Sequence, residues 1–401
     1  MRNILILSLA LLAPAASADQ QKEQPKRLIV GFKADVDATT QEELLQRFGL
    51  TDLESIDGLN ARIVEAAPGQ FSPSAMRMMA DPSIYYVEED FYTNWLRGAA
   101  PVGFSQVPMP ALDAVMSGLP KFEKQDATEG EQPWGVVRVG AEKAWQRGVD
   151  GRGVRVAVID TGIDCAHPDL KANCQKGYNA IDSKKPPTDD NSHGTHVAGT
   201  IAAANDGQGV VGVAPAAKLY PVKVLDADGG GSLTSIIKGL VWAGNNGMQI
   251  ANMSLGSSRG SVFMRLAVSY AKARGVALLC AAGNSGGSVG YPAAYDACIA
   301  VAASDSGNNV AEFSSRGKQV DFIAPGVDVK STVPGGGYDR YSGTSMATPH
   351  AAGLAALAVQ QGAAGKDGVM AALKKAAKPL DGLSGEEQGM GMPNAEFIRG
   401  K

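Results

Sequence analysis

The sequence predicts an α/β protein whose main part is a doubly wound, mostly parallel sheet with helices on both faces. The first observation is a series of near-continuous apolar runs, VRVAVID (154–160), AKLYPVKVL (217–225), MQIANMSL (248–255), VALLCAAGN (276–284) and CIAVAAS (298–304). The second is that helical stretches such as SLTSIIKGLVWAGNNG and SVFMRLAVSYAKARG lie between them. Apolar runs without alternation indicate parallel strands that are buried on both faces. In such a sheet, reactive groups collect at the carboxyl ends of the strands.

A smaller α+β unit is predicted ahead of this sheet. Three strand-like segments, RLIVGFK (27–33), LNARIVEA (59–66) and YYVEEDFY (85–92), are separated by helical segments TTQEELLQRFG (39–49) and SPSAMRMMA (72–80). This order favours a small sheet with helices on one face. From about residue 98 to 132 the chain is rich in Pro, Gly and Ala without periodicity, which predicts a linker. The predicted boundaries are therefore 19–97 for the small unit, 98–132 for the linker and 133–401 for the main domain.

The amino terminus has the pattern of a secretory signal peptide at residues 1–18. Arg2 is followed by an apolar run from Ile4 to Leu12 and by small residues from Ala16 to Ala18. That run is shorter than a membrane span, and no later run reaches the roughly 18 apolar residues that a span needs. The formal net charge of −4 gives no reason to expect nucleic acid or an anionic membrane as a partner. We therefore expect a secreted protein without a membrane span.

The four cysteines are expected to pair after export, because thiols outside the cytosol tend to form disulfides. Cys165 and Cys174 are close in sequence, while Cys280 and Cys298 end and begin neighbouring apolar runs. Of the three possible connectivities we expect the local one, Cys165 with Cys174 and Cys280 with Cys298. A zinc site that includes His167 is the alternative, and the absence of a fourth ligand at suitable spacing disfavours it.

Histidines limit the choice of a base that works near neutral pH, since the chain has only four. They are His167, His193, His196 and His350. The segment NSHGTHVAGT (191–200) predicts a helix that starts near His193 and presents this side chain toward a cleft. His196 lies deeper along the same helix and is expected to be buried. His167 lies in a turn beside two cysteines, where a structural role is expected.

An acid and a nucleophile can be placed in the same way. Asp160 ends the run VRVAVID, where it could orient a histidine base; a turn or cap role is the alternative. In YSGTSMATPH (341–350), Ser345 follows small residues at the start of an Ala-rich helix, whose dipole favours a developing negative charge. His350 comes five residues later, about 500° around the helix. It therefore points away from Ser345 and is expected to have a packing or capping role.

Three of these segments together resemble a known family. VAVIDTGID (156–164), NSHGTHVAGT and YSGTSMATPH are similar, in this chain order, to the Asp, His and Ser signature segments of subtilisin-like serine peptidases. The similarity continues through GVAPAAKLYPVKVL, ANMSLG, AAGNS, GYPAAY and APGVDV, and so extends from 133 to about 360. The resemblance implies that Asp160 orients His193, that His193 is the general base and acid, and that Ser345 is the nucleophile. It also implies that Asn284, in AAGNS, donates a hydrogen bond to the oxyanion.

The leader resembles the inhibitory propeptide of secreted subtilases, most clearly in DPSIYYVEEDFY (81–92). This resemblance implies a ferredoxin-like propeptide at 19–97 that assists folding, inhibits the enzyme within the same chain and is removed when the precursor processes itself. The linker at 98–132 departs from the family pattern, in which the leader abuts the catalytic domain, and the maturation site within it stays open. The expected product is a secreted, monomeric endopeptidase that acts on polypeptides.

Two further segments imply how substrate binds. DADGGGS (226–232) and SLGSS (254–258) resemble the two edges between which the family holds a peptide as an added strand. The residues implied for substrate binding are Gly229, Gly230, Gly231, Ser254, Leu255, Gly256, Ala281, Ala282, Gly283 and Gly290. The pocket residues among them are small or apolar and include no acid. We therefore expect the side chain before the scissile bond to be large and apolar or aromatic rather than Lys or Arg.

A structural calcium ion is implied by the likeness of AAANDGQGV (202–210) to the calcium loop of the family. The implied ligands are the carboxylates of Asp169 and Asp206 and the carbonyl oxygens of Ala204, Gln208 and Val210, a set that suits a hard cation. A plain Asn-Asp-Gly turn would look the same. The further amino-terminal ligand of the family has no clear counterpart in this chain.

Two other functions compete with the peptidase. A catalytically silent scaffold on the same fold would be marked by loss of Asp160, His193, Ser345 or Asn284, and all four are present. An esterase or lipase with the same triad is disfavoured because no Gly-x-Ser-x-Gly motif surrounds Ser345.

Overall fold

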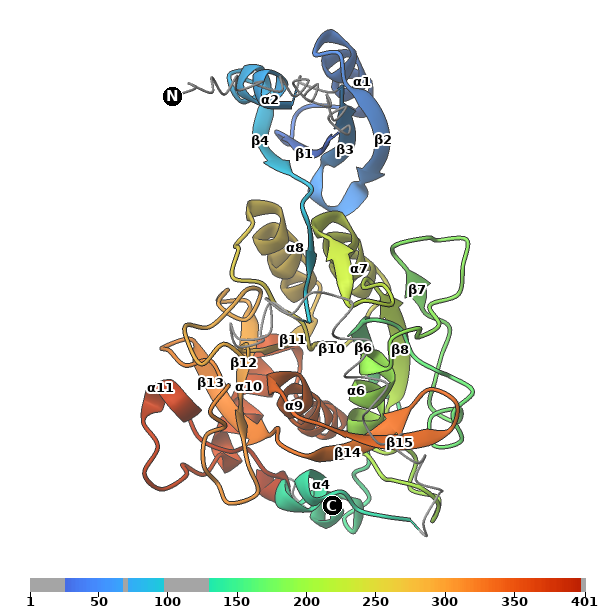
Figure 1. The fold of residues 1–401 in the computed structure, drawn as a ribbon, viewed down its shortest axis with the longest axis vertical. Coiled ribbons are helices and arrows are strands. Elements are labelled where there is room, and N and C mark those ends of the chain that lie inside the picture. Colours follow the sequence, from blue (N-terminus) through green and yellow to red (C-terminus); the bar gives the residue numbers. More distant parts are fainter. Residues whose placement is uncertain (1–25, 68–70, 97–129, 398–401) are drawn as a thin grey trace, which may run out of the picture.

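The computed structural model describes residues 26–67, 71–96 and 130–397, which form a small unit and a large unit (Figure 1). The signal peptide expected at 1–18 and nearly all of the linker expected at 98–132 lie outside the described residues. In Figure 1 the small unit lies at one end of the large unit, and its last strand continues into the large unit.

The small unit has the chain order β1 (Lys26–Phe32), α1 (Ala38–Arg47), β2 (Thr51–Ile56), β3 (Ala61–Ala66), α2 (Phe71–Met79) and β4 (Ile84–Glu89). Its antiparallel sheet has the strand order β2-β3-β1-β4, which is the expected ferredoxin-like arrangement. Strand β2 was not predicted from the sequence. This edge strand is polar and only its last residue, Ile56, is buried, so it carries no apolar signal.

The two faces of the small sheet belong to different cores. Leu28 and Val30 of β1 pack with Leu44 of α1 in a core of the small unit alone. Ile29 of β1 and Ile63 of β3 belong instead to a core that the small unit shares with the large one. Successive side chains of a strand point to opposite faces. One face of this sheet is therefore covered by its own helices and the other by the large unit.

The large unit contains a seven-stranded parallel sheet with the strand order β13-β12-β11-β10-β6-β8-β7. The strands are β6 (Arg155–Asp160), β7 (Tyr178–Asn179), β8 (Lys218–Lys223), β10 (Ile250–Met253), β11 (Ala277–Ala281), β12 (Cys298–Ser304) and β13 (Val320–Pro325). All five predicted apolar runs are strands. The strand order reverses between β6 and β10, so the sheet is doubly wound with its switch point there. The predicted fold class is confirmed.

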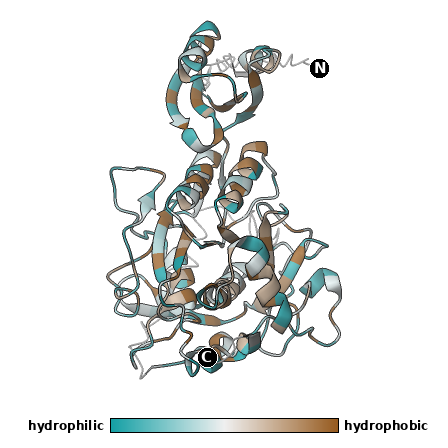
Figure 2. Cartoon of the chain, turned by 180° about the vertical axis from the view of Figure 1, so that it is seen from behind, coloured by the Kyte–Doolittle hydropathy of each residue, from teal (hydrophilic) through white to brown (hydrophobic). Residues whose placement is uncertain are grey.

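Helices cover both faces of this sheet. One face carries α6 (His193–Ala202) and α9 (Thr344–Gln360), and the other carries α7 (Leu233–Asn245) and α8 (Val262–Ala273). Alternate residues of β6 belong to the two resulting cores, so the central strand is buried on both sides. Figure 2 shows apolar residues gathered on the strands and on the helices beside them.

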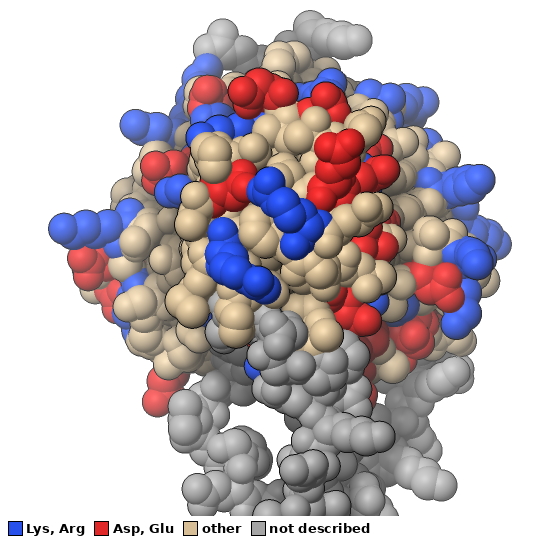
Figure 3. Space-filling view, turned by 90° about the horizontal axis from the view of Figure 1, so that it is seen from above, with Lys and Arg blue, Asp and Glu red and all other residues tan. Residues whose placement is uncertain are grey.

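The remaining elements surround these layers. They are η1 (Asp57–Leu59), β5 (Tyr92–Asn94), α4 (Trp134–Arg138), α5 (Ala141–Trp145), β9 (Gly230–Ser232), β14 (Val329–Val333), β15 (Gly337–Tyr341), α10 (Gly365–Ala376), α11 (Gly385–Gln388) and η2 (Ala395–Phe397). Strands β14 and β15 form an antiparallel pair just before α9, and β5 pairs with β9 across the two units. In the part of the chain that the structure describes, no helix has the length and apolar character needed to cross a membrane. On the face seen in Figure 3, acidic and basic side chains are interspersed.

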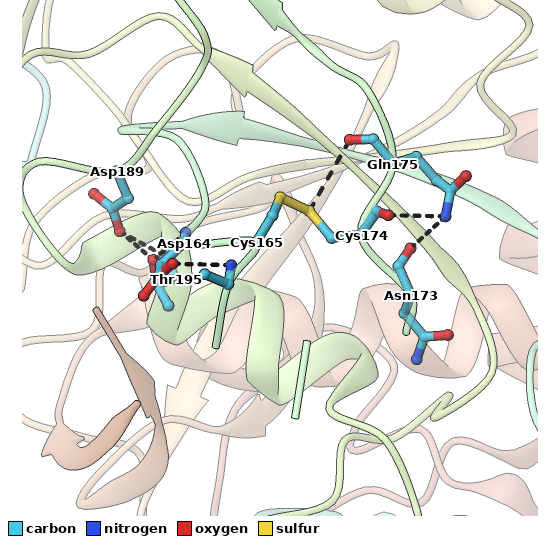
Figure 4. Close-up of a disulfide and its surroundings, with 8 residues drawn as sticks. Asp164, Cys165, Asn173, Cys174, Gln175, Asp189 and Thr195 are labelled. Carbon is cyan, nitrogen blue, oxygen red and sulfur yellow. Dashed lines mark hydrogen bonds between the residues drawn. A yellow bond between two sulfur atoms is a disulfide. The ribbon is translucent and has the colours of Figure 1, made fainter. Parts of the chain in front are cut away.

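Only one of the two expected disulfides is present. Cys165 and Cys174 are joined, with their Cα atoms 5.5 Å apart (Figure 4). Cys280 and Cys298 are free and buried. In the register of β11 and β12, Cys298 lies opposite Leu278, so Cys280 is its diagonal neighbour. The two thiols lie within hydrogen-bonding reach of each other, but no bond joins them. The expected Cys280–Cys298 disulfide is therefore not formed in this structure.

Candidate active site

Asp160 and His193 meet at the switch point of the sheet. Asp160 is the last residue of β6 and is completely buried, and His193 is the first residue of α6. The Oδ1 atom of Asp160 is 2.8 Å from Nδ1 of His193, and it also accepts a hydrogen bond from the Thr161 N–H (2.7 Å). A neutral ring that donates from Nδ1 has Nε2 as its proton acceptor.

The surroundings of His193 make its imidazole more basic. Burial alone would lower the pKa of this ring, because it disfavours the charged form. The charge of Asp160, the hydrogen bond to Asp160 and the charge of Asp189 act in the opposite direction and outweigh burial, so the pKa is raised from its ordinary value. A ring that a carboxylate orients in this way is suited to general base catalysis.

Ser345 lies at the same end of the sheet. It is the second residue of α9, and its hydroxyl donates to the Ser254 carbonyl oxygen at 3.1 Å. Strands β6 and β10 are neighbours, with Val158 opposite Asn252. Two residues further along, Asp160 and Ser254 therefore lie at the same strand ends. The Ser345 hydroxyl thus lies at the same edge of the sheet as the Asp160–His193 pair, and in this structure its hydrogen bond goes to Ser254.

Asn284 is held with its amide near the start of α9. Its Oδ1 atom accepts hydrogen bonds from the N–H (2.7 Å) and the hydroxyl (2.8 Å) of Thr344. Its Nδ2 atom would lie 3.3 Å from a Cβ added to Gly343, the residue that precedes the helix. The Ser345 N–H is in the first helical turn, where no acceptor exists within the helix. The same added Cβ would lie 3.6 Å from the Ser345 nitrogen, so the Asn284 amide and the Ser345 N–H lie near one point beside Gly343.

The two edges predicted to bind substrate hold the end of the small unit. Strand β5 pairs antiparallel with β9, and the Trp95 N–H donates to the Gly229 carbonyl at 3.0 Å. On the other side, the Gly256 N–H donates to the Trp95 carbonyl at 3.0 Å. Residues 92–95 are therefore an added strand between the two edges.

A pocket opens beside Ser345. Residues from the predicted set line it, namely Leu255, Gly256, Ala281, Gly283 and Gly290, whereas Ser254 and Ala282 are not among its lining residues. The lining includes no charged side chain. Sequence reasoning missed its hydroxyl groups, which belong to Ser257, Ser258, Ser285, Ser288, Ser315 and Thr344. Ser285 and Ser315 are separated by 30 residues in the sequence, but their hydroxyl oxygens lie 3.3 Å from each other. No local sequence pattern predicts this contact.

The loop predicted to bind calcium combines a buried carboxylate with carbonyl groups. Asp169 is buried, and its carboxylate accepts hydrogen bonds from the Val210 N–H (2.9 Å) and the Tyr338 hydroxyl (3.0 Å to Oδ2). Burial raises the pKa of Asp169, and the neighbouring charge of Asp206 adds to that effect, while those two hydrogen bonds oppose it. A cation here would offset the cost of burying one carboxylate beside another.

The carbonyl groups of this loop divide into two sets. Those of Gly207 and Gly209 accept hydrogen bonds from the N–H groups of Gly130 (3.0 Å) and Glu131 (2.7 Å). Among the described residues, no hydrogen bond is made to the carbonyl oxygens of Ala204, Gln208 and Val210. No cluster of three His, Cys, Asp or Glu that could hold a metal occurs in the described ranges, so carbonyl groups would have to complete any site. Two carboxylates with three such carbonyls fit the donor set that Ca²⁺ prefers.

The other histidines have structural surroundings. His167 contacts the Gly337 carbonyl at 3.0 Å, and His196 stacks on Tyr341 with ring centres 4.3 Å apart. Burial lowers the pKa of His196 to about 3 and that of His350 to about 4. Both rings are therefore neutral at neutral pH.

Known proteins match this chain over most of its length. Residues 151–391 match the family model described as the subtilase family. M-protease of Shouchella clausii (strain KSM-K16) is 41% identical over 373 residues, which cover 89% of this chain and 87% of M-protease. Subtilisin E of Bacillus subtilis (strain 168) is 40% identical over 360 residues, 88% of this chain and 85% of that protein. Subtilisin Savinase of Lederbergia lenta is 55% identical over 230 residues, 57% of this chain and 84% of Savinase. The chain therefore belongs to the subtilase family and is a subtilisin-like serine endopeptidase.

Proposed function

We propose that Asp160, His193 and Ser345 are the catalytic triad of this endopeptidase and that Asn284 is the side-chain donor to the oxyanion. The observation that carries this proposal is the 2.8 Å contact between Asp160 and His193, at the edge of the sheet where Ser345 lies in the first turn of α9. The raised pKa of His193 supports its role as the base.

The reaction follows from these positions. Rotation about the Cα–Cβ bond turns the Ser345 hydroxyl from Ser254 to Nε2 of His193, which accepts its proton as the oxygen attacks the scissile carbonyl carbon. The Ser345 N–H and Nδ2 of Asn284 donate to the resulting oxyanion. The His193 imidazolium then protonates the leaving amine, while Asp160 stays ionised. Water, activated by His193 in turn, hydrolyses the acyl-enzyme.

The substrate is a polypeptide that binds as an added strand between Gly229–Gly231 and Ser254–Gly256. The way residues 92–95 lie along both edges supports this mode. The pocket beside Ser345 is small-residue and apolar with hydroxyl groups and no acid, and it includes Ala281, Gly283 and Gly290. Phe, Tyr, Leu or Met before the scissile bond should therefore be cleaved faster than Lys or Arg, whose charge would be buried without a partner.

The precursor carries its own inhibitor. Residues 1–18 are the signal peptide, 19–97 the propeptide, 98–132 a linker that contains the maturation site, and 133–401 the catalytic domain of a secreted, monomeric enzyme. Two carboxylates of the small unit cap helices of the large unit, which supports the propeptide role. Glu88 accepts hydrogen bonds from the Ser261 hydroxyl (2.8 Å) and the Phe263 N–H (3.3 Å) at the start of α8. Asp90 accepts one from the Thr234 N–H (2.8 Å) at the start of α7.

Calcium stabilises the catalytic domain without taking part in the reaction. The carboxylates of Asp169 and Asp206 and the carbonyls of Ala204, Gln208 and Val210 would hold it. A ligand that binds only the folded state at 100 times its Kd adds about 2.7 kcal/mol to the free energy of unfolding. Chelation should therefore lower the unfolding temperature of the processed enzyme, and Asp206→Ala should abolish the difference that added calcium makes. An unfolding temperature that ignores both chelator and added calcium would contradict this role.

One experiment tests the proposed function directly. The intact mass of the secreted protein is measured for the native chain, for Ser345→Ala and for Ser342→Ala, and each product is assayed on peptides with Phe or Arg before the scissile bond. Ser342 is a matched control, because it is a nearby serine whose hydroxyl accepts a hydrogen bond from the Asp328 N–H (2.9 Å). In a subtilisin, the established reference case, removing the nucleophile costs about 10⁶ in kcat.

Ser345→Ala should keep its leader and lose hydrolysis, while Ser342→Ala should be processed and active like the native chain. The mass of the processed protein then locates the maturation site. Trimming of Ser345→Ala to the same mass would mean that another protease removes the leader. Native chain that keeps its leader and hydrolyses nothing would favour the silent scaffold, and faster cleavage after Arg would refute the proposed specificity.

A further inference from the structure

Asp189 is a buried carboxylate four residues before His193, outside the proposed triad. Only 6% of its surface is exposed. Its Oδ1 atom accepts hydrogen bonds from the Thr161 hydroxyl (2.8 Å) and from the N–H groups of Asn191 and Ser192 (3.0 Å each). Its Oδ2 atom accepts from the N–H (2.9 Å) and the hydroxyl (2.5 Å) of Thr195, as Figure 4 shows. Five donors thus converge on one carboxylate.

These donors surround His193 along the chain. Ser192 directly precedes His193 and Thr195 follows it by two residues. The Thr161 hydroxyl accepts a hydrogen bond from the Gly194 N–H (2.9 Å), and Thr161 directly follows Asp160. The Asp189 carboxylate therefore fixes the backbone on both sides of His193 and connects it with the end of β6.

The start of α6 depends on this carboxylate. The N-cap residue Ser192 has φ 101° and its side chain accepts no hydrogen bond from the helix; its hydroxyl contacts the Tyr341 hydroxyl at 3.0 Å. The N–H of the third helical residue, Thr195, which an N-cap side chain ordinarily accepts, donates to Asp189 instead. A non-glycine residue in the left-handed region costs about 1–3 kcal/mol and persists only where its surroundings determine it. The hydrogen bonds from the N–H groups of Ser192 and Thr195 to Asp189 hold Ser192 in this conformation.

We propose that Asp189 is a positioning residue for His193, which holds the backbone from Ser192 to Thr195 in place relative to Asp160 and whose negative charge favours the protonated imidazole. This inference rests on the proposed triad and deepens it. Proton transfer requires reacting groups at fixed distance and orientation, so freedom in this backbone would reduce the productive fraction of Asp160–His193 pairs.

The sign of the expected pH effect follows from the charges around His193. Those that act on its pKa are the charges of Asp160, at the end of β6, and Asp189. The other titratable groups of these elements are His196 in α6, Tyr341 in β15, Lys223 in β8 and Asp190 in the same loop as Asp189. Burial keeps His196 neutral by lowering its pKa to about 3, and burial raises the pKa of Tyr341, which is then neutral as well.

Lys223 is balanced by its own partners. Its ammonium bonds to Asp190 (2.6 Å) and to the carbonyl oxygens of Thr161 (2.7 Å) and Leu225 (2.9 Å). Asp160 and Asp189 are then the two anions that favour imidazolium. Removing the charge of Asp189 lowers the pKa of His193, so the acid limb of kcat/KM moves to lower pH.

The test compares three variants of the full chain after processing, each normalised to active sites titrated with a sulfonyl fluoride. Asp189→Asn removes the charge with little change of shape. Thr161→Val keeps the charge and removes the link between Asp189 and Gly194. Asp321→Asn is the control, because Asp321 is a half-buried carboxylate distant from the triad, where it accepts a hydrogen bond from the Ala300 N–H (2.9 Å).

Asp189→Asn should lower kcat about 10- to 100-fold with KM changed less than about twofold, because an interaction made in the transition state is lost. Its acid limb should move down by about half to one pH unit. Thr161→Val should lower kcat without moving the acid limb, and Asp321→Asn should change neither.

Native kcat and an unmoved acid limb in Asp189→Asn would overturn the proposal, as would an equal loss in Asp321→Asn. If Asp189→Asn does not fold, Thr161→Val decides, since native kcat in that variant would also overturn it. Activity in Ser345→Ala would instead refute the triad itself, which separates the two failures.

Discussion

The large unit covers both faces of its sheet with its own helices, whereas the small unit covers only one face of its sheet in this way. In the large unit, two cores enclose a parallel sheet whose strands are buried on both faces. In the small unit, one face of the sheet is covered by α1 and α2, but Ile29 and Ile63 on the other face pack into the core of the large unit. At Gly31 the contact is close enough that an added Cβ would lie 2.9 Å from the Phe263 ring. The small unit is therefore shaped by the large one.

The largest expected effect is the loss of the small unit's fold when it is alone. A domain of about 70 residues buries little apolar surface even when its core is complete. Isolated residues 26–97 should lack dispersed amide NMR signals and show reduced helical ellipticity. Adding the processed native enzyme, blocked at Ser345 with a sulfonyl fluoride so that it cannot digest the segment, should restore both. A well-dispersed spectrum of the isolated segment would contradict this prediction, because it would mean that one covered face of the sheet is sufficient for the small unit to fold.

The next effect concerns the large unit, which has a covalent link of its own. Cys165 and Cys174 are separated by nine positions. Closing a loop of this size stabilises the folded state by about 2–3 kcal/mol. The double variant Cys165→Ser/Cys174→Ser should lose that much in urea unfolding, while the affinity for the small unit is unchanged. A matched double variant, Cys280→Ser/Cys298→Ser, reports on buried free thiols instead. Equal reductant sensitivity in both variants would contradict the assignment of a single disulfide.

The same difference in burial decides which strands could be predicted from the sequence. Strands such as β6 and β12 are continuous apolar runs because both faces are buried, so composition alone located them. Strand β2 is an exposed edge in which only Ile56 is buried, so it shows neither an apolar run nor an alternating pattern, and it was not predicted. The triad candidates lie in distinctive segments at strand or helix ends, and the sequence placed Asp160 and Ser345 at such ends correctly.

Features that depend on register or backbone path were beyond the sequence. Cys280 and Cys298 were expected to pair, and the strands bring their thiols together, but no bond joins them. Asp189 precedes His193 by four residues in an ordinary polar loop, and only the folded backbone brings five donors to it. The pocket serines come from three separate loops and share no local pattern.

A smaller effect tests the contact between the units. Glu88 caps α8 through Ser261 and Phe263, whereas Glu89 beside it makes an exposed ion pair with Arg259 at 3.6 Å. Loss of a helix cap costs about 1 kcal/mol or somewhat more, and loss of an exposed ion pair costs about 0–1 kcal/mol. As a separate inhibitor of the processed enzyme, the small unit with Glu88→Ala should bind about tenfold more weakly. Glu89→Ala should change the inhibition constant less than about threefold. The reverse order would show that helix capping does not hold the units together.

The smallest expected effect is a pH dependence of the same contact, which comes from Asp90. Its Oδ1 atom accepts a hydrogen bond from Thr234, while its Oδ2 atom has no partner among the described residues. Burial raises the pKa of Asp90; the hydrogen bond from Thr234 and the charge of Arg27 oppose this, and the charge of Glu89 adds to it.

Because the pKa of Asp90 is higher in the docked than in the free small unit, docking is favoured most below the ordinary pKa of an aspartate. That advantage is lost as pH rises through the docked value. Affinity for the processed enzyme, blocked at Ser345 with a sulfonyl fluoride, should therefore decrease from pH 4 upward for the native small unit. The decrease should be smaller for Asp90→Asn, which keeps the Thr234 hydrogen bond without a charge. The ratio of the two dissociation constants removes titrations that both complexes share, including that of His193. A ratio that stays constant with pH would show that Asp90 is not the group that makes docking sensitive to pH.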